Sequence, residues 1–425
     1  MQKLHTIAAA ALACGLTFAA PAGALTFKAD YNFCSLASCA DGHFPASTPA
    51  ADASGNWYAT TEIGGKYDKG AVVRIDSTGK LTVVHSFCAQ ANCTDGSLPL
   101  GGVVVGTDGS LYGMTTQGGL SNAGLVYKLT PNGAKWTYQL IHKFCIRAGC
   151  TDGKTPNYTA LTYQGASSGV LYDGTSPLFG TTQYGGAHNL GTAFSLKFDG
   201  SVWREQVLYN FCSLAACADG YYPRSGVFVD GSGNIFGMAA SGGANSDAGA
   251  VYELIPRGTK YREFVLYNFC KLASCADGRN PTSPPIVIGT TLYGTTVIGG
   301  AQNEGTVFKL ALHGVNSILT TLHSFCSETN CTDGEQPFGD VGLTMSASGD
   351  LYGTAEAGGD HGGGLIYKLG GSKHITFAKV YSFDNSMGDG ASPRAGLALS
   401  PSGALYGTGS LGGTMGGGTL YHLTP

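Results

Sequence analysis

Residues 325–337 read Phe325-Cys-Ser-Glu-Thr-Asn-Cys-Thr-Asp-Gly-Glu-Gln-Pro337, and variants of this stretch recur along the chain. The C-x4-C spacing occurs six times, and the Asp-Gly-x-x-Pro part occurs seven times. Successive copies of Asp-Gly are separated by 54, 57, 67, 58, 56 and 56 residues, and the longest interval carries an insertion around residues 165–175. Such self-similarity predicts a repeat architecture in which each repeat forms one supersecondary unit.

A second signature follows the first in every repeat. Residues 293–300 read Tyr-Gly-Thr-Thr-Val-Ile-Gly-Gly, and residues 305–310 read Gly-Thr-Val-Phe-Lys-Leu. Around these signatures lie short alternating runs separated by Gly- and Asn-containing turns, a pattern typical of β-hairpins. Each repeat therefore predicts four short strands. Seven such repeats predict an all-β, seven-bladed β-propeller of four-stranded antiparallel blades.

The two ends of the repeat region complement each other. The seventh repeat stops after its third expected strand, at residues 419–423. Residues 25–31 precede the first repeat and match the fourth strand of the others. We therefore expect the N-terminal strand to complete the last blade and close the ring.

Twelve cysteines form six identical C-x4-C pairs. In an oxidising compartment such pairs predict local disulfides. Zinc is disfavoured because a structural zinc site needs four converging ligands and each pair supplies two. The expected pairs are Cys34/Cys39, Cys88/Cys93, Cys145/Cys150, Cys212/Cys217, Cys270/Cys275 and Cys326/Cys331.

The repeated Asp-Gly and the aromatic column before it have structural interpretations. An Asp side chain caps turns, and Gly supplies a positive φ. Calcium ligation by the Asp residues stays open as an alternative, although calcium needs six to eight oxygens; no other cofactor is predicted. The column in which His85, His142 and His323 alternate with tyrosines predicts a half-buried ring.

Residues 1–24 have the features of a secretory signal peptide: a positive start, an apolar run and the small residues Ala22-Gly23-Ala24. A lipidated Cys14 is the alternative. The mature chain, 25–425, is then expected to be a single propeller domain, monomeric, and secreted or periplasmic. The formal net charge of −4 gives no electrostatic footprint for nucleic acid, and no later stretch predicts a membrane span.

The two signatures together resemble a known repeat. Residues 293–308, alternating with Leu322-His-Ser-Phe325 and Asp-Gly-x-x-Pro, are similar to the GloVer (Gloeo/Verruco) tandem repeat of bacterial exported proteins, often of a "choice-of-anchor" type. The resemblance implies export but no particular activity. The sequence ends at Pro425, just past an expected strand, so we expect no C-terminal anchor.

A functional site should break the sevenfold pattern, and rigid scaffolds carry such sites on loops. The topology predicts that the Cys-x4-Cys and Gly-Gly loops open on one face, with the residues after Asp-Gly near the channel mouth. The candidate ligand-binding residues there are Phe44, Lys154, Tyr222, Arg224, Arg279, Arg394, His188 and His361. Candidates for a catalytic role are Tyr221, His43, Glu62 and Glu356. Ordinary solvated surface is the alternative interpretation.

Two classes of function are compatible with these residues. The first is a non-catalytic binding or scaffold protein whose ligand is a glycan or an extracellular protein. The second is an enzyme acting on an anionic polysaccharide, in which Arg and Lys neutralise a carboxylate and a Tyr or His abstracts a proton, as in a lyase. A glycoside hydrolase using Glu62 and Glu356 is a further option, which depends on the separation of the two carboxylates.

Overall fold

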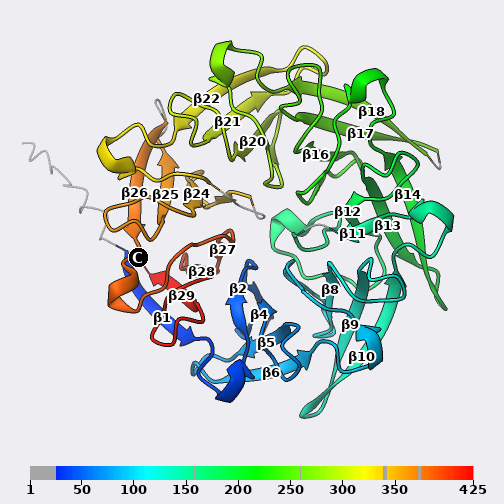
Figure 1. Cartoon of the computed structure of the whole chain (residues 1–425), viewed down its shortest axis with the longest axis vertical. Helices are drawn as coiled ribbons and strands as arrows, with labels where there is room; N and C mark the ends of the chain where they lie inside the picture. The colour runs from blue at the N-terminus through cyan, green and yellow to red at the C-terminus, as the bar shows by residue number, and fades with distance from the viewer. Residues whose placement is uncertain (1–24, 157, 259, 338–341, 372–374, 425) are drawn as a thin grey trace, which may run out of the picture.

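The computed structural model describes residues 25–424, except 157, 259, 338–341 and 372–374. These residues form seven antiparallel sheets arranged as blades around a central axis (Figure 1). We number the blades I to VII in the order of the Asp-Gly copies. The predicted seven-bladed propeller is confirmed, and the proposed signal peptide, residues 1–24, lies outside the described residues.

The strands run outward within each blade, from short inner strands to long outer ones. The inner strand of blade I is divided into β2 and β3, so that its sheet has five strands. The strands of blades I to III are β2 (His43–Pro45), β3 (Ala50–Ala51), β4 (Trp57–Ile63), β5 (Ala71–Ile75), β6 (Leu81–Ser86), β7 (Val104–Val105), β8 (Leu111–Thr115), β9 (Leu125–Asn132), β10 (Lys135–Lys143), β11 (Lys154–Pro156), β12 (Leu178–Tyr184), β13 (Thr192–Phe198) and β14 (Trp203–Asn210). Those of blades IV to VII are β15 (Phe228–Val229), β16 (Ile235–Ala239), β17 (Ala250–Arg257), β18 (Lys260–Asn268), β19 (Ile286–Ile288), β20 (Thr291–Thr296), β21 (Thr306–Ala311), β22 (Ile318–Ser324), β23 (Thr344–Met345), β24 (Leu351–Ala355), β25 (Leu365–Gly370), β26 (Thr376–Ser382), β27 (Ala398–Leu399), β28 (Leu405–Gly409), β29 (Thr419–Thr424) and β1 (Thr26–Asn32).

The N-terminal strand closes the ring as predicted. β1 pairs antiparallel with β29, from Thr26 opposite Thr424 to Asn32 opposite Thr419. His422 Nδ1 lies 2.6 Å from the Asp30 carboxylate across this pair. Because the outer strand of blade VII comes from the opposite end of the sequence, the ring is closed by main-chain hydrogen bonds.

The six predicted disulfides are present in the described residues. Each lies in a loop that contains a single turn of 3-10 helix, and these turns lie at the outer edge of the ring (Figure 1). The turns of the disulfide loops are η1 (Ala37–Cys39), η2 (Ala91–Cys93), η3 (Ala148–Cys150), η5 (Ala215–Cys217), η6 (Ala273–Cys275) and η7 (Thr329–Cys331). Blade VII has η8 (Asn385–Met387) without a disulfide, and the insertion of blade III contains η4 (Ala166–Ser168).

The Asp of Asp-Gly is the centre of each disulfide loop. The buried Asp277 carboxylate accepts hydrogen bonds from the Lys271 and Leu272 amides (2.9 and 3.1 Å) and from the Tyr267 hydroxyl (2.7 Å). In the blades that carry His in this column, Nε2 faces the same carboxylate, at 3.1 Å between His323 and Asp333. The turn-capping role predicted for Asp is therefore confirmed. Tyr and His therefore occupy the same position: the tyrosine hydroxyls donate to the carboxylate, and the histidine rings lie beside it.

Burial keeps the histidine rings of this column neutral. It lowers the pKa of His142 to about 4, against the opposing effect of the Asp152 carboxylate. The pKa values of His85 and His323 are lowered for the same reason. These rings are therefore neutral structural groups rather than acid–base groups near neutral pH.

Neighbouring blades pack through a column on their outer strands. In this column Phe27 stacks on Tyr381 of the preceding blade (4.2 Å between ring centroids), and Phe377 stacks on His323 (3.9 Å). The register of β14 and β18 places Glu205 and Glu263 at the same position. Two carboxyl groups therefore replace apolar groups at the interfaces between blades II, III and IV.

Burial raises the pKa values of both glutamates. That of Glu205 rises to about 7, opposed by the guanidinium of Arg147, whose Nη2 lies 2.8 Å from the carboxylate. That of Glu263 rises to about 8, and the nearby Asp219 carboxylate adds to the effect of burial. Among the described residues, Glu263 Oε1 is buried without a hydrogen-bond partner.

Replacement of the central carboxylate tests its structural role. We expect Asp277→Asn to lower the free energy of unfolding by about 2 kcal/mol. The asparagine amide lacks the charge that strengthens these hydrogen bonds, and its NH₂ group would face the donors that the carboxylate now accepts from. The measurement is equilibrium denaturation of the oxidised protein. Asp76→Asn, in an exposed turn, is the control and should have a clearly smaller effect; equal losses would contradict the assignment.

The raised pKa of Glu263 predicts a pH dependence of stability. The folded protein holds this proton more tightly than the unfolded chain does. The contribution of the protonated Glu263 carboxyl group to the free energy of unfolding is therefore fully present below pH 4.5 and is lost as the pH rises to about 8. Glu263→Gln cannot ionise, so its melting temperature should match the wild type at pH 4.5 and exceed it increasingly towards pH 8. Thermal melts across this range measure the gap. A gap that does not change with pH, or one equally shown by the exposed Glu328→Gln control, would contradict the prediction.

Candidate functional site

Two kinds of loop meet on one face of the propeller, which we call the loop face. In the six blades that carry a disulfide, the amide of the second glycine of the Gly-Gly pair donates to a cysteine carbonyl, as from Gly65 to Cys39 (2.9 Å) and from Gly300 to Cys275 (3.0 Å). The predicted convergence of these loops is therefore confirmed. The disulfide loops lie outermost, and the chain runs inward from them through Asp-Gly-x-x-Pro.

The residue immediately before the Pro adopts left-handed backbone geometry in every copy. Its amide donates to a carbonyl of the preceding blade, as from Tyr222 to Leu190 (3.0 Å) and from Thr155 to Ala123 (2.8 Å). The φ values lie between 51° and 56° for Phe44, Leu98, Thr155, Tyr222, Asn280, Gln336 and Ser392. This kink links adjacent blades and sets the direction of the side chains beside it.

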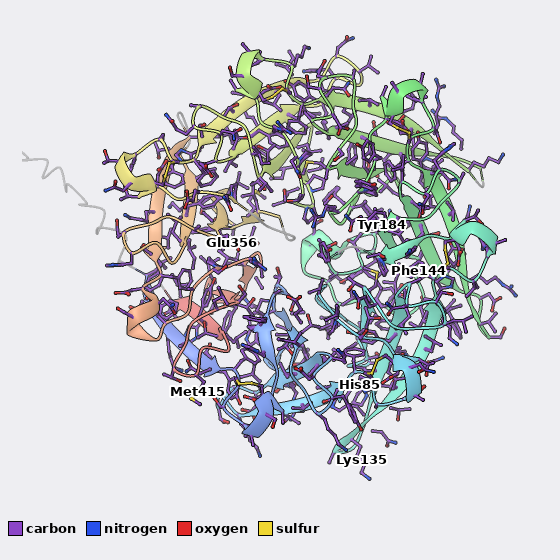
Figure 2. The ribbon with its side chains drawn as sticks, in the orientation of Figure 1. His85, Lys135, Phe144, Tyr184, Glu356 and Met415 are labelled. Carbon is purple, nitrogen blue, oxygen red and sulfur yellow. A yellow bond between two sulfur atoms is a disulfide. The ribbon has the colours of Figure 1, made fainter. Side chains whose placement is uncertain are left out.

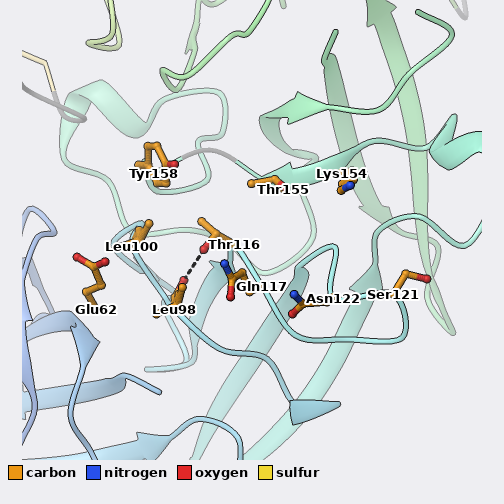
Figure 3. Close-up of a pocket in the computed structure, with 10 residues that line it drawn as sticks. All are labelled: Glu62, Leu98, Leu100, Thr116, Gln117, Ser121, Asn122, Lys154, Thr155 and Tyr158. Atoms are coloured by element: carbon orange, nitrogen blue, oxygen red, sulfur yellow. Dashed lines mark hydrogen bonds between the residues drawn. The ribbon is translucent and has the colours of Figure 1, made fainter. Parts of the chain in front are cut away.

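The loop face contains a cavity of about 460 Å³ between blades I, II and III (Figure 3). It combines charged, amide and hydroxyl groups with one aromatic ring. Two predicted site residues, Glu62 and Lys154, lie in its wall. The lining residues are Glu62, Leu98, Leu100, Thr116, Gln117, Ser121, Asn122, Lys154, Thr155 and Tyr158.

Comparison with another blade explains why Glu62 is available to a ligand. Its counterpart Glu356 accepts hydrogen bonds from Arg394 Nε (2.7 Å) and from the Ser392 hydroxyl (3.0 Å), both on the next blade. The residue after Pro on the blade next to Glu62 is Leu100, whose side chain has no hydrogen-bond donor. Within the described part of the chain, no hydrogen bond or ion pair engages the Glu62 carboxylate, which faces the cavity.

Tyr158 connects this cavity to Arg224. The Arg224 guanidinium carbon lies 5.3 Å from the centre of the Tyr158 ring. Tyr158 was not predicted as a site residue. From Pro to the first paired residue of the inner strand, blade III is one residue longer than blades I, II, IV, V and VII. In the sequence, Asn157 is the residue after Pro in blade III, as Arg224 is in blade IV. Asn157 lies outside the described residues, and the one-residue difference in length hid Tyr158 from the prediction.

A row of tyrosines continues from Lys154 across the junction of blades III and IV. Lys154 is the cross-strand partner of Tyr184. The Tyr184 and Tyr222 rings are 5.1 Å apart, and Tyr222 and Tyr221 are 4.7 Å apart, in edge-to-face contacts. The Tyr221 hydroxyl donates to Asp247 (2.9 Å), and burial together with this carboxylate raises its pKa.

The predicted site residues on other parts of the loop face are not among the residues that line the cavity. His43 stacks on Phe44 (4.0 Å) at the start of blade I. Arg279 and His188 are exposed, and His361 lies 3.8 Å from Asp384. Glu356 and Tyr184 lie on opposite sides of the ring's centre (Figure 2). Of the predicted site residues, only Glu62 and Lys154 are among the described residues that line the cavity.

A second cavity, of about 340 Å³, involves the turn between β15 and β16 and the insertion of blade III. Phe228 and Phe236 contribute rings to it, and Gln164 from the insertion donates to the Gly231 carbonyl (2.7 Å). Its polar groups are therefore largely engaged within the protein, and the loop-face cavity is the stronger candidate site.

One group of potential metal-ligating side chains occurs in the described residues: Cys326, Cys331 and Glu335. Both sulfur atoms belong to a disulfide and are not thiolates, the form that binds metal. The group therefore does not fit a metal site.

Comparison with known families identifies the repeat. The model of the Gloeobacter/Verrucomicrobia repeat matches residues 13–177 and 266–425. The chain belongs to this family. The resemblance to GloVer repeats is thereby confirmed. Residues 178–265, which lie outside the match, include Tyr184, Tyr222 and Arg224.

Further comparisons give only distant similarities. No curated protein matches the sequence. Among solved structures, a candidate 6-phosphogluconolactonase from Bacteroides uniformis is 15% identical, with a TM-score of 0.48 over 80% of this chain and 84% of the other. The α-L-arabinanase of Penicillium chrysogenum, complexed with arabinobiose, is 11% identical, with a TM-score of 0.43 over 84% and 99% of the two chains. Neither similarity bears on the activity of this protein.

The left-handed geometry of Thr155 predicts an effect on stability. A β-branched residue is strained at φ 55°, so Thr155→Gly should raise the free energy of unfolding by about 1 kcal/mol. Thr155→Ala, which keeps Cβ, is the control and should recover less. Denaturation curves of the wild type and the two variants give the free energies of unfolding. A Gly variant less stable than the Ala variant would contradict the claim that Thr155 is strained.

Proposed function

We propose that this protein is an exported, non-catalytic binding protein that holds a glycan in the loop-face cavity. The supporting observation is the composition of that cavity: an aromatic ring, Tyr158, beside the unpaired Glu62 carboxylate and the Gln117 and Asn122 amides. Ligand sites in proteins are typically clefts of about 300–1,000 Å³ with a few well-placed polar groups.

Sugars match this combination chemically. A sugar ring has apolar C–H faces that pack against aromatic rings, and hydroxyls that both donate and accept hydrogen bonds. The Glu62 carboxylate accepts from hydroxyls, and the amides can do both. Asn122 Oδ1 is held by the Gly118 amide (2.8 Å), which fixes the direction of its NH₂ group as a donor.

Several contacts favour binding over catalysis. A tyrosine base must lose its proton, but the Tyr221 hydroxyl donates to Asp247 and its pKa is raised. A glycosidase needs two carboxyl groups flanking the substrate bond, whereas Glu62 is the one carboxylate among the described lining residues and Glu356 is held by Arg394.

Export is supported by the disulfides. Six disulfides are typical of a protein from an oxidising, extracytoplasmic compartment. We include residues 1–24 in this proposal as the signal peptide that directs export. The described residues contain no helix long and hydrophobic enough to span a membrane.

A glycan array probed with the oxidised protein tests the proposal. We expect a defined set of glycans to bind, and Tyr158→Ala to weaken that binding at least tenfold without changing the melting temperature. Tyr67→Ala, at an exposed tyrosine of blade I, is the matched control and should bind normally. Absence of glycan binding, or binding that Tyr158→Ala does not weaken, would refute the proposal. New ultraviolet absorbance from unsaturated sugars, produced when the protein is mixed with uronate polymers, would favour a lyase.

A further inference from the structure

The cations of the loop face fall into two classes. Arg394 is paired with Glu356, Arg147 with Glu205, and Lys379 with Asp360. The cations with no carboxylate partner among the described residues include Lys154, Arg224 and Arg279. Lys154 lines the cavity and Arg224 lies against Tyr158, so two positive charges face one unpaired carboxylate, Glu62, in this part of the loop face.

Arg224 is also incompletely hydrogen-bonded. Its Nε is buried and has no acceptor among the described residues. A buried donor without an acceptor costs free energy, roughly 1–3 kcal/mol, and such groups in folded proteins commonly have a ligand, ion or water as their partner. The guanidinium lies against Tyr158, which lines the cavity, so an acceptor on a bound molecule would offset this cost.

The chemistry of these two cations selects a carboxylate. The planar guanidinium fork matches the two oxygens of a carboxylate, and such charge-assisted hydrogen bonds are about twice as strong as neutral ones. Lys154 supplies a second positive charge, on the exposed strand end opposite Tyr184. Lys154 lines the same cavity as Tyr158, and Arg224 lies against the Tyr158 ring, so one ligand that enters the cavity can meet both positive charges.

The tyrosines suit that chain. Tyr184, Tyr222 and Tyr221 continue the site away from the cavity in consecutive edge-to-face contacts. A single sugar fills a cavity but does not need this continuation. An oligosaccharide can occupy both the cavity and the row.

We propose that the ligand is a carboxylate-bearing glycan chain, a polyuronate, that pairs with Lys154 and Arg224 and packs along Tyr158 and the Tyr184–Tyr222–Tyr221 row. This inference rests on the proposed glycan-binding function. Glu62, on the blade I side of the cavity, accepts hydrogen bonds from hydroxyls of the same chain.

Paired ligands test the charge requirement. Calorimetry at low salt compares an oligogalacturonate with the same oligosaccharide after reduction of its carboxyl groups to alcohols. We expect the acidic chain to bind at least tenfold more tightly, and its affinity to fall as salt is added. Arg224→Gln and Lys154→Gln should each lower the affinity for the acidic chain about tenfold or more, and leave that for the neutral chain nearly unchanged.

The repeat supplies matched controls. Arg279 occupies the position of Lys154 in blade V, and Arg394 is the residue after Pro in blade VII, as Arg224 is in blade IV. Arg279→Gln and Arg394→Gln should retain the wild-type affinity for the acidic chain. Melting temperatures of all four variants establish that each is folded.

The outcomes separate this inference from the proposal beneath it. Equal affinity for the acidic and neutral chains, with Arg224→Gln and Lys154→Gln unaffected, overturns the carboxylate ligand and leaves glycan binding intact. Equal binding of a sulfated chain also overturns it, because the site would then recognise negative charge alone. Absence of binding to every glycan overturns both.

Discussion

One buried carboxylate in each blade determines the geometry on which the rest of the loop face depends. In the six blades that carry a disulfide, the Asp of Asp-Gly accepts two main-chain amides from the disulfide loop and lies beside a Tyr or His side chain on the outer strand, as Asp219 does with Ser213, Leu214 and Tyr209. Because these donors converge on one buried group, the loop, the strand and the turn to the next blade are fixed together. The left-handed residue three positions later then bonds to the preceding blade.

This regular scaffold makes the departures from it informative. Blades III and IV differ from the others at several positions. Tyr158 lies in a connection that is one residue longer than in most other blades, and Tyr184, Tyr221 and Tyr222 form a row of rings. Glu205 and Glu263 replace rings or aliphatic groups at the same blade interfaces. The candidate site and the two buried glutamates therefore occur in neighbouring parts of the ring, and much of this region lies in residues 178–265, outside the family match.

The sequence predicted features that are repeated and missed those that depend on contacts between blades. The fold, the ring closure and the disulfides follow from motifs that occur six or seven times. The left-handed position was missed because the residues there, such as Phe44 and Thr155, are not glycines and give no signal. The pairing of Arg394 with Glu356, and hence the freedom of Glu62, depends on which side chain the adjacent blade supplies. Tyr158 was missed because blade III has one extra residue between Pro and its inner strand, so positions numbered from Pro no longer correspond between blades.

A crystal structure of the oxidised protein with a bound oligouronate tests the central claim most directly. The account predicts sugar density in the loop-face cavity, with one ring against Tyr158, hydroxyls on Glu62 and a carboxylate on Arg224. Density in the cavity beside Phe228 and Phe236, or a sugar chain on the loop face with its carboxylates turned away from Lys154 and Arg224, would contradict it.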